Sequence, residues 1–270
     1  MRHKVCLAVF STNRPEYLSR TLEAQRNLDF ADCAVDRILI DDMPRGRDDS
    51  EIRYLAKQHG YRELILHREN LSIGATWEEL WARIRDRDYD YVLQQEDDVE
   101  VLQRVSVVDM ISALEEIPGL SQVVLKRQPW YAHETASAAL DSDTEFRDFR
   151  GEFTDAACFF TPISSLYPIA RTRVDYRAWY RDNYPNEPAL HTVNVNEAVI
   201  GKALLEGFGL RSMHLKDRCG GNIIRHIGEY TVGKKVLPGE PGYEGFACCD
   251  PCVKYWSGTN RPYENGEARC

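Results

Sequence analysis

Short apolar runs alternate with segments of helical periodicity along the first half of the chain. The apolar runs predict strands, which we place at Lys4–Phe10, Val35–Ile40, Glu63–His67 and Tyr89–Gln94. Segments with apolar residues every three or four positions predict helices, which we place at Glu16–Arg26, Ser50–His59, Ile73–Arg87 and Val105–Ile117. Gly60 is a plausible stop for the second helix. The pattern indicates a repeated strand–helix unit.

Each predicted strand contains a continuous apolar stretch, which is typical of strands buried on both faces. Such strands form a mostly parallel sheet with helices on each side, so we expect an α/β fold of Rossmann-like type. Ligands of these folds bind beyond the carboxyl ends of the strands. Polar residues follow three of the predicted strands there, namely Thr12 and Arg14, Asp41 and Asp42, and Glu96 to Asp98.

The second half is less regular. We expect strands at Gln122–Leu125, Ala156–Phe160, Gly209–Leu215 and Asn222–Ile227, and helices at Thr172–Tyr180 and Asn194–Glu206. From Thr231 onward the chain is rich in glycine, proline and charge. No linker-like stretch separates two domains, so we expect one domain over residues 1–230 and a loop-rich extension over residues 231–270.

Charge and hydropathy exclude several classes of partner. The 34 Lys and Arg residues against 43 Asp and Glu give a net charge of −9, which disfavours general binding to nucleic acid or to anionic membranes. No apolar run approaches the roughly 18 residues of a membrane span. The first apolar run is too short for the core of a signal peptide, so we expect a soluble, cytoplasmic protein.

The eight cysteines fall into two groups. Cys6, Cys33, Cys158 and Cys219 are scattered, and we expect buried free thiols. Near the C-terminus stand Cys248, Cys249, Cys252 and Cys270. They include a lone C-x-x-C, which without a second pair is a weak indication of zinc, and the missing signal peptide disfavours disulfides. The role of this second group is left open.

Three consecutive carboxylates, Glu96, Asp97 and Asp98, come directly after the fourth predicted strand. Their mutual repulsion is costly unless a cation or solvent relieves it. A hard divalent cation with oxygen ligands is one partner, and a solvated acidic turn is the alternative. In an extended chain Glu96 and Asp98 point the same way and Asp97 points opposite, so either the pair or the single residue can face a ligand.

Four segments carry a family resemblance through their order and spacing. The first strand ends in a Thr-containing Arg-Pro turn (Ser11–Pro15), and the second ends in Asp41-Asp42. A loose N-x-G segment spans Asn70–Ala75, and Glu96–Asp98 closes the fourth strand. Over residues 4–230 the chain resembles GT-A glycosyltransferases, closest to the inverting, nucleotide-sugar-dependent family 2 type. Glu96 replaces the first Asp of that family's D-x-D motif.

The resemblance implies a GT-A fold with a nucleotide-sugar-binding half over residues 1–120 and an acceptor-binding half over 121–230. Thr12, Arg14 and Asp42 would hold the nucleoside. Arg68 would approach the base or the phosphates, and Glu96 the ribose. The full implied donor site is Thr12, Arg14, Asp41, Asp42, Arg68, Gly74, Glu96 and Asp97. Asp98 and His226 would bind the metal, Mn²⁺ or Mg²⁺.

Family 2 enzymes also carry an acidic residue near the start of a later helix, where it deprotonates the acceptor. Here the matching segment is Val195–Gly209, which makes Glu197 the implied general base. Asn194-x-x-Glu197 also fits a helix-capping pattern, which is the structural alternative. Asp155 is a second acid that could line the acceptor site, although an ordinary loop position is the simpler interpretation.

The leading hypothesis is an enzyme that moves a sugar from a nucleoside-diphosphate sugar, with UDP-sugar as the default, to a hydroxyl acceptor with inversion. One alternative is a nucleotidyltransferase, although Ser11–Pro15 lacks the usual glycines. Another is a non-catalytic nucleotide-binding module. The acceptor is open among glycan, lipid, protein, metabolite and DNA. A hydroxymethylated DNA base, extruded from the duplex, is a minority option, with phosphate contacts from Arg171, Arg173, Arg177 and Arg181. The oligomeric state is also open.

Overall fold

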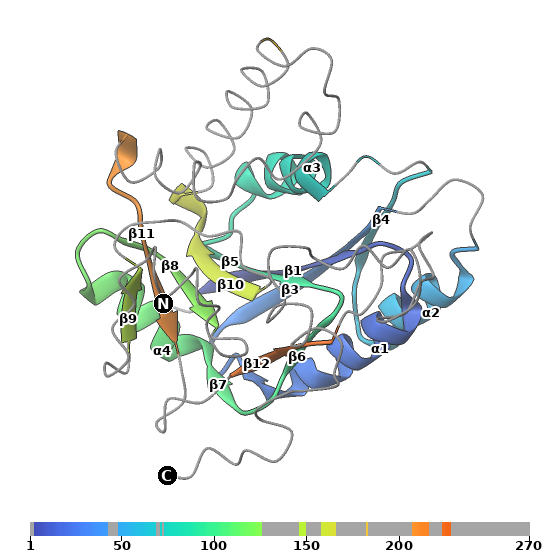
Figure 1. Cartoon of the computed structure of the whole chain (residues 1–270), viewed down its shortest axis with the longest axis horizontal. Helices are drawn as coiled ribbons and strands as arrows, with labels where there is room; N and C mark the ends of the chain where they lie inside the picture. Colours follow the sequence, from blue (N-terminus) through green and yellow to red (C-terminus); the bar gives the residue numbers. More distant parts are fainter. Residues whose placement is uncertain are drawn as a thin grey trace, which may run out of the picture.

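A computed structural model describes residues 3–42, 48–68, 71, 73–125, 146–149, 158–165, 182, 207–215 and 223–227. Figure 1 shows the arrangement of their helices and strands. The helices are α1 (Pro15–Ala24), α2 (Ser50–Gln58), α3 (Ile73–Arg85) and α4 (Val107–Glu116). The strands of the large sheet are β1 (Lys4–Ser11), β3 (Ala34–Asp41), β4 (Glu63–Leu66), β5 (Tyr91–Glu96), β8 (Leu120–Leu125), β9 (Phe146–Phe149), β10 (Cys158–Pro162) and β11 (Arg211–Leu215). Smaller ladders pair β2 (Leu28–Asp29) with β7 (Val105–Ser106), and β6 (Val99–Val101) with β12 (Ile224–His226).

The large sheet has the strand order β4-β3-β1-β5-β10-β8-β11-β9. Strands β4, β3, β1 and β5 are parallel neighbours, and β10 enters antiparallel between β5 and β8. Strand β11 pairs parallel with β8, and β9 closes the edge antiparallel. The sheet is therefore mostly parallel, as the continuous apolar runs predict.

Helices cover both faces of this sheet (Figure 1). Along β1, side chains alternate between the faces. Val5 and Leu7 pack in one core with α4, and Val9 packs with α1 and α2. Cys6 and Ala8 face the opposite core, which contains the buried side of α3. The expected α/β class, a mostly parallel sheet of Rossmann-like type with helices on both faces, is confirmed.

Helix α3 shows how the helical pattern becomes a core. Trp77, Leu80, Trp81 and Ile84 recur at spacings of three and four, and all four are fully buried. The rings of Trp77 and Trp81 stack with centroids 5.9 Å apart, and Trp81 Nε1 donates to Gln94 Oε1 of β5 at 3.2 Å. The helix is thus fixed above the strand that leads to the acidic turn.

The boundaries of some helices and strands differ by a few residues from the predicted ones. The helix predicted from Val105 begins at Val107, because Ser106 caps it by accepting a hydrogen bond from the Asp109 N–H at 3.1 Å. Strand β5 reaches Glu96, past the predicted end. Strands β2, β6, β7 and β9 were not predicted, since two to four residues carry no readable period. Gly60, with φ +73°, follows α2 as predicted.

Some predicted elements lie outside the described residues, among them the helices at 172–180 and 194–206 and the extension at 231–270. The buried thiols are confirmed for Cys6, Cys33 and Cys158. Burial raises the pKa of the Cys6 thiol to about 12, so this thiol is inert as a nucleophile. Cys219 and the four C-terminal cysteines lie outside the described part.

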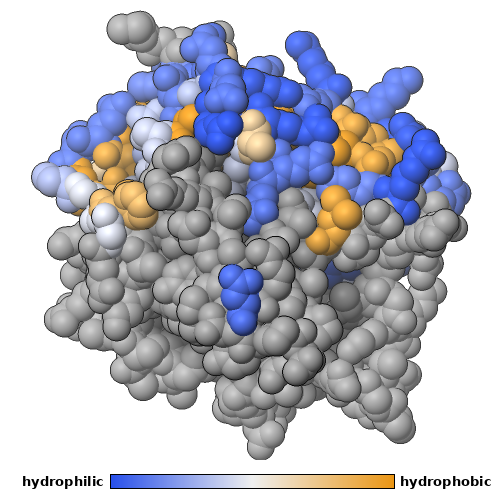
Figure 2. All heavy atoms as spheres, turned by 90° about the horizontal axis from the view of Figure 1, so that it is seen from above, coloured by the Kyte–Doolittle hydropathy of each residue, from blue (hydrophilic) through white to orange (hydrophobic). Residues whose placement is uncertain are grey.

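The surface of the described residues is mixed in character. Among the coloured residues of Figure 2, hydrophilic side chains are interrupted by separate hydrophobic areas. The large exposed apolar residues come from different segments of the chain and are Tyr54, Leu71, Leu102, Ile117 and Phe208. Within the described residues, none of the helices has the length and apolar character needed to cross a bilayer.

Candidate functional site

The polar residues singled out in the sequence meet at one edge of the sheet. In the strand register Ser11 lies opposite Asp41, Asp41 lies opposite Leu66, and Phe10 lies opposite Glu96. The residues that follow β1, β3, β4 and β5 therefore leave the sheet at the same level. This is the carboxyl edge, where α/β folds of this type bind ligands.

Arg14 lies between the two aspartates of the acidic turn. Its Nε and Nη2 form a two-pronged contact with Asp97, with Nε 3.3 Å from Oδ2, and its Nη1 is 2.9 Å from Asp98 Oδ2. Exposed fractions of the three side chains are 13%, 2% and 5%. The guanidinium thus supplies from within the chain the counter-charge that the acidic run requires.

Burial shifts the proton equilibria of this group. It raises the pKa of both Asp97 and Asp98, and the attraction of Arg14 offsets part of the shift. For Arg14, burial alone lowers the pKa, but the two aspartates outweigh it and the pKa is raised. Arg14 is therefore permanently charged, and one cation faces two carboxyl groups.

Backbone contacts hold the acidic turn in place. Thr12 N–H donates to Asp97 Oδ2 at 3.2 Å. The buried hydroxyl of Thr21, on α1, donates to the Asp97 carbonyl at 2.6 Å and accepts from Val99 N–H at 3.1 Å. Ile227 N–H donates to the Asp98 carbonyl at 2.7 Å. The acidic turn is therefore hydrogen-bonded to the residue after β1, to α1 and to the residue after β12.

Strand β12 brings the chain around His226 to this turn. His226 lies opposite Val99 in the β6–β12 ladder, one residue beyond Asp98. Glu100 accepts from Arg20 Nε of α1 at 2.8 Å and from Arg225 Nε of β12 at 2.9 Å, which fixes the ladder to α1. The structure therefore brings the backbones of Asp98 and His226 together across more than 120 residues of sequence. Glu100 was not predicted, because its partners Arg20 and Arg225 come from distant segments of the chain.

Asp41 is buried at the end of β3. Its Oδ2 accepts the Asn13 N–H at 2.9 Å. Burial raises the pKa of its carboxyl, the Ser11 hydroxyl and the Asn13 N–H offset part of the shift, and the nearby charges of Asp97 and Asp42 add to it. A carboxylate in this position is costly to ionise unless a ligand or cation joins it.

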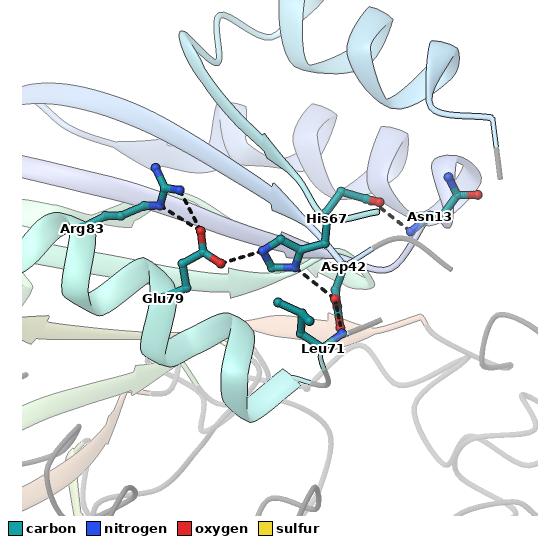
Figure 3. A network of polar contacts seen from close by, with 7 residues as sticks. Asn13, Asp42, His67, Leu71, Glu79 and Arg83 are labelled. Carbon is teal, nitrogen blue, oxygen red and sulfur yellow. Dashed lines mark hydrogen bonds and ion pairs between the residues drawn. The ribbon is translucent and has the colours of Figure 1, made fainter. Parts of the chain in front are cut away.

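Asp42 belongs to a second polar group, drawn in Figure 3. Its Oδ1 accepts the Leu71 N–H at 2.7 Å and lies 3.0 Å from His67 Nδ1. The other ring nitrogen of His67 is 2.8 Å from Glu79 Oε2 on α3, and Arg83 donates to Glu79 Oε1. His67 was not among the predicted site residues, although its place directly after β4, at the same edge as Asp42, could have indicated it.

The remaining predicted donor-site residues are placed less centrally. Arg68 follows His67 and is exposed. Gly74 lies in the first turn of α3. Glu96, the last residue of β5, is partly buried. Glu197 and Asp155 lie outside the described residues, so their predicted roles are untested.

The donor chemistry of the acidic turn fits a hard divalent cation. Among the described residues no three His, Cys, Asp or Glu side chains are grouped so as to hold a metal ion. Mg²⁺ is nevertheless commonly bound by one or two carboxylates together with substrate phosphates. Asp98, with Glu96 two residues before it, provides such oxygens.

Comparisons with known proteins give fold similarity only. No protein-family model and no curated protein matches the chain. One similar solved structure is a mannosyltransferase from Pyrobaculum calidifontis in complex with GDP-mannose and Mn²⁺. Its sequence identity is 15% and its TM-score 0.45, over 62% of this chain and 46% of the mannosyltransferase. The chain thus spans less than half the length of that enzyme, and similarity at this level says nothing about activity.

Proposed function

We propose that the protein is a metal-dependent glycosyltransferase that moves a sugar from a nucleoside-diphosphate sugar to a hydroxyl acceptor. The observation that carries this proposal is the meeting of two acidic strand ends at one edge of the sheet. Asp41 ends β3 and Asp42 follows it, while Asp97 and Asp98 follow β5, and all four are buried. Such carboxylates suit a nucleoside with hydrogen-bond donors and a diphosphate carried by a cation.

Asp42 is the proposed contact for the base. An ionised carboxylate only accepts hydrogen bonds, so Asp42 would accept an N–H of the base, either the ring N–H of uracil or guanine or an exocyclic amino group. UDP-sugar is our preferred donor. Thr12, Asp41, Arg68 and Gly74 complete the proposed nucleoside and phosphate surroundings. Because Asp42 is buried, donor entry must open this edge of the sheet.

Asp98 is the proposed metal ligand, with Glu96 toward the ribose and His226 as a further ligand. A bound Mn²⁺ or Mg²⁺ stabilises the charge on the departing diphosphate. Arg14 neutralises part of the charge of Asp97 and Asp98, which reduces their repulsion of an incoming diphosphate. This supports a role for Arg14 in the donor site in addition to the ion pairs it makes.

Glu197 is the proposed base. Its carboxylate removes the proton of the acceptor hydroxyl, and that oxygen attacks the anomeric carbon from the face opposite the diphosphate. The new carbon–oxygen bond forms as the bond to the diphosphate breaks, so the sugar configuration inverts. The acceptor hydroxyl belongs to a glycan, lipid, protein or small metabolite, or to a hydroxymethylated base in DNA.

The test is a screen of UDP-, GDP-, ADP- and CDP-sugars with Mn²⁺ and a mixed acceptor panel, followed by chromatography of the released nucleotide. We expect release of a nucleoside diphosphate, with UDP from the preferred donor. Asp98→Asn and Glu197→Gln should each lower turnover at least ~100-fold with the fold retained. Release of pyrophosphate instead would support a nucleotidyltransferase. Metal-dependent nucleotide binding without turnover would support a non-catalytic module.

A further inference from the structure

His67 joins three elements at the proposed donor site. It follows β4, its side chain is buried, and it lies between Asp42 at the end of β3 and Glu79 on α3 (Figure 3). Both ring nitrogens are engaged, Nδ1 at 3.0 Å from Asp42 Oδ1 and Nε2 at 2.8 Å from Glu79 Oε2. These two polar contacts indicate that His67 does more than pack against its neighbours.

Each carboxylate partner of His67 has a second donor. Asp42 Oδ1 also accepts the Leu71 N–H at 2.7 Å. Glu79 Oε1 accepts from Arg83 Nε at 3.0 Å and from its Nη2 at 2.7 Å. Although burial by itself raises the pKa of Glu79, the contacts with Arg83 and His67 outweigh it and the pKa is lowered. Glu79 is thus an ionised and firmly oriented anchor for the imidazole.

The orientation of an aspartate carboxylate is not set by its own bonds, because rotation about its last torsion is broad. In Asp42 the contacts of Oδ1 with Leu71 N–H and with His67 both restrict that rotation. Removing the His67 contact takes away one of these restraints. A base that binds Asp42 would then have to order it at the cost of affinity.

We propose that His67 is a positioning residue whose Nδ1 holds the Asp42 carboxylate in the orientation that receives the nucleobase, while Glu79 holds the imidazole from α3. This inference rests on the proposed function, in which Asp42 contacts the base. It assigns α3 a part in donor affinity. The variants His67→Asn and His67→Gln test the contacts of the two ring nitrogens one at a time.

In His67→Asn the amide nitrogen stands near the place of Nδ1, so the contact with Asp42 is kept and that with Glu79 is lost. In His67→Gln the amide nitrogen stands near the place of Nε2, so the contact with Glu79 is kept and that with Asp42 is lost. Both variants remove one buried hydrogen bond, so similar losses of stability are expected. Only the positioning role distinguishes them.

The experiment measures donor KM and kcat for the full chain with the donor found in the screen. We expect His67→Gln to raise donor KM about 10-fold or more with kcat within about 3-fold, as lost ground-state binding requires. His67→Asn should stay within about 3-fold of the unmodified chain in both constants. An equal rise of KM in the two variants, or a larger rise in His67→Asn, would overturn the proposal.

A second measurement needs no substrate. The Leu71 amide, whose N–H bonds the same Asp42 oxygen, reports the position of that carboxylate in a ¹H–¹⁵N spectrum of the nucleotide-free protein. We expect a clear shift of this signal in His67→Gln and a near-native signal in His67→Asn. An unchanged signal in both variants would overturn the positioning of Asp42. If the unmodified chain binds no nucleotide while this contrast is found, it is the proposed function that fails.

Discussion

The two acidic groups at the carboxyl edge of the sheet are built differently. Asp97 and Asp98 share one arginine from inside the chain, with all three side chains largely buried. Asp42 instead ends a chain of contacts that leads through His67 and Glu79 to Arg83, whose side chain is 45% exposed. In the first group the cationic partner, Arg14, is largely buried. In the second group the last cationic partner, Arg83, is about half exposed to solvent. We therefore expect the first to dominate stability and the second to adjust ligand binding.

The largest effect should come from removing the cation of the first group. Arg14→Met leaves Asp97 and Asp98 buried without their counter-charge, so the free energy of unfolding should fall by about 3–5 kcal/mol. Urea denaturation followed by circular dichroism measures this.

Arg20→Met, in helix α1 that follows Arg14, is the matched control, because Arg20 is about half exposed and pairs with Glu100. It should cost less than about 1 kcal/mol. Equal losses of unfolding free energy in Arg14→Met and Arg20→Met would contradict the prediction. The buried ion pairs of Arg14 would then stabilise the fold no more than the exposed pair of Arg20.

The second effect tests how the acidic turn is held. In Thr21→Val the hydroxyl that bridges the Asp97 carbonyl and the Val99 N–H is replaced by a methyl group of similar size. Two buried backbone groups lose their partner, so we expect a loss of roughly 2 kcal/mol in unfolding free energy. Ser106→Ala, which removes the cap of α4, serves as a local control at about 1 kcal/mol. A loss below that of the control would show that Arg14 and the N–H groups of Thr12 and Ile227 fix the turn without the Thr21 hydroxyl.

The comparison also shows what sequence could predict. The edge position of Asp41, Asp42 and Asp97 followed from strand periodicity, since apolar runs end where the sheet ends. The use of Arg14 as counter-charge for Asp97 and Asp98, rather than for a ligand alone, did not follow, because the sequence contains no information on which rotamer a long side chain adopts. Glu79 appeared as an ordinary helix residue. The contact of Glu79 with His67 depends on how α3 packs across the sheet. A local sequence pattern does not predict that packing.

A third effect concerns the pH dependence of Asp41. Its pKa is raised in the folded chain, first by burial, so the folded state binds the proton more tightly than the unfolded state. The stabilising contribution is complete below the ordinary carboxyl pKa of about 3.9 and is lost as pH rises through the raised value. Asp41→Asn keeps an acceptor for Asn13 N–H and has no charge to bury.

Asp41→Asn should therefore be the more stable protein at neutral pH, by about 1 kcal/mol. The difference between the two unfolding free energies should grow from pH 4 upward, which urea titrations at several pH values measure. In the proposed enzyme the variant should bind the donor less tightly. A less stable variant at neutral pH would mean that ionised Asp41 makes a favourable contact that outweighs its burial.

The smallest effect should come from the outer end of the second group. Arg83→Ala removes a half-exposed partner that stands four residues after Glu79 on α3, a pairing worth about 0.3–0.5 kcal/mol in helices. Glu79 remains held by His67 Nε2, so stability should change by less than about 1 kcal/mol. Arg85→Ala, which removes an exposed contact with Asp86 on the same helix, is the control. If Arg83→Ala instead costs as much as Thr21→Val, the second group carries its charge internally as the first does, and the distinction between them is wrong.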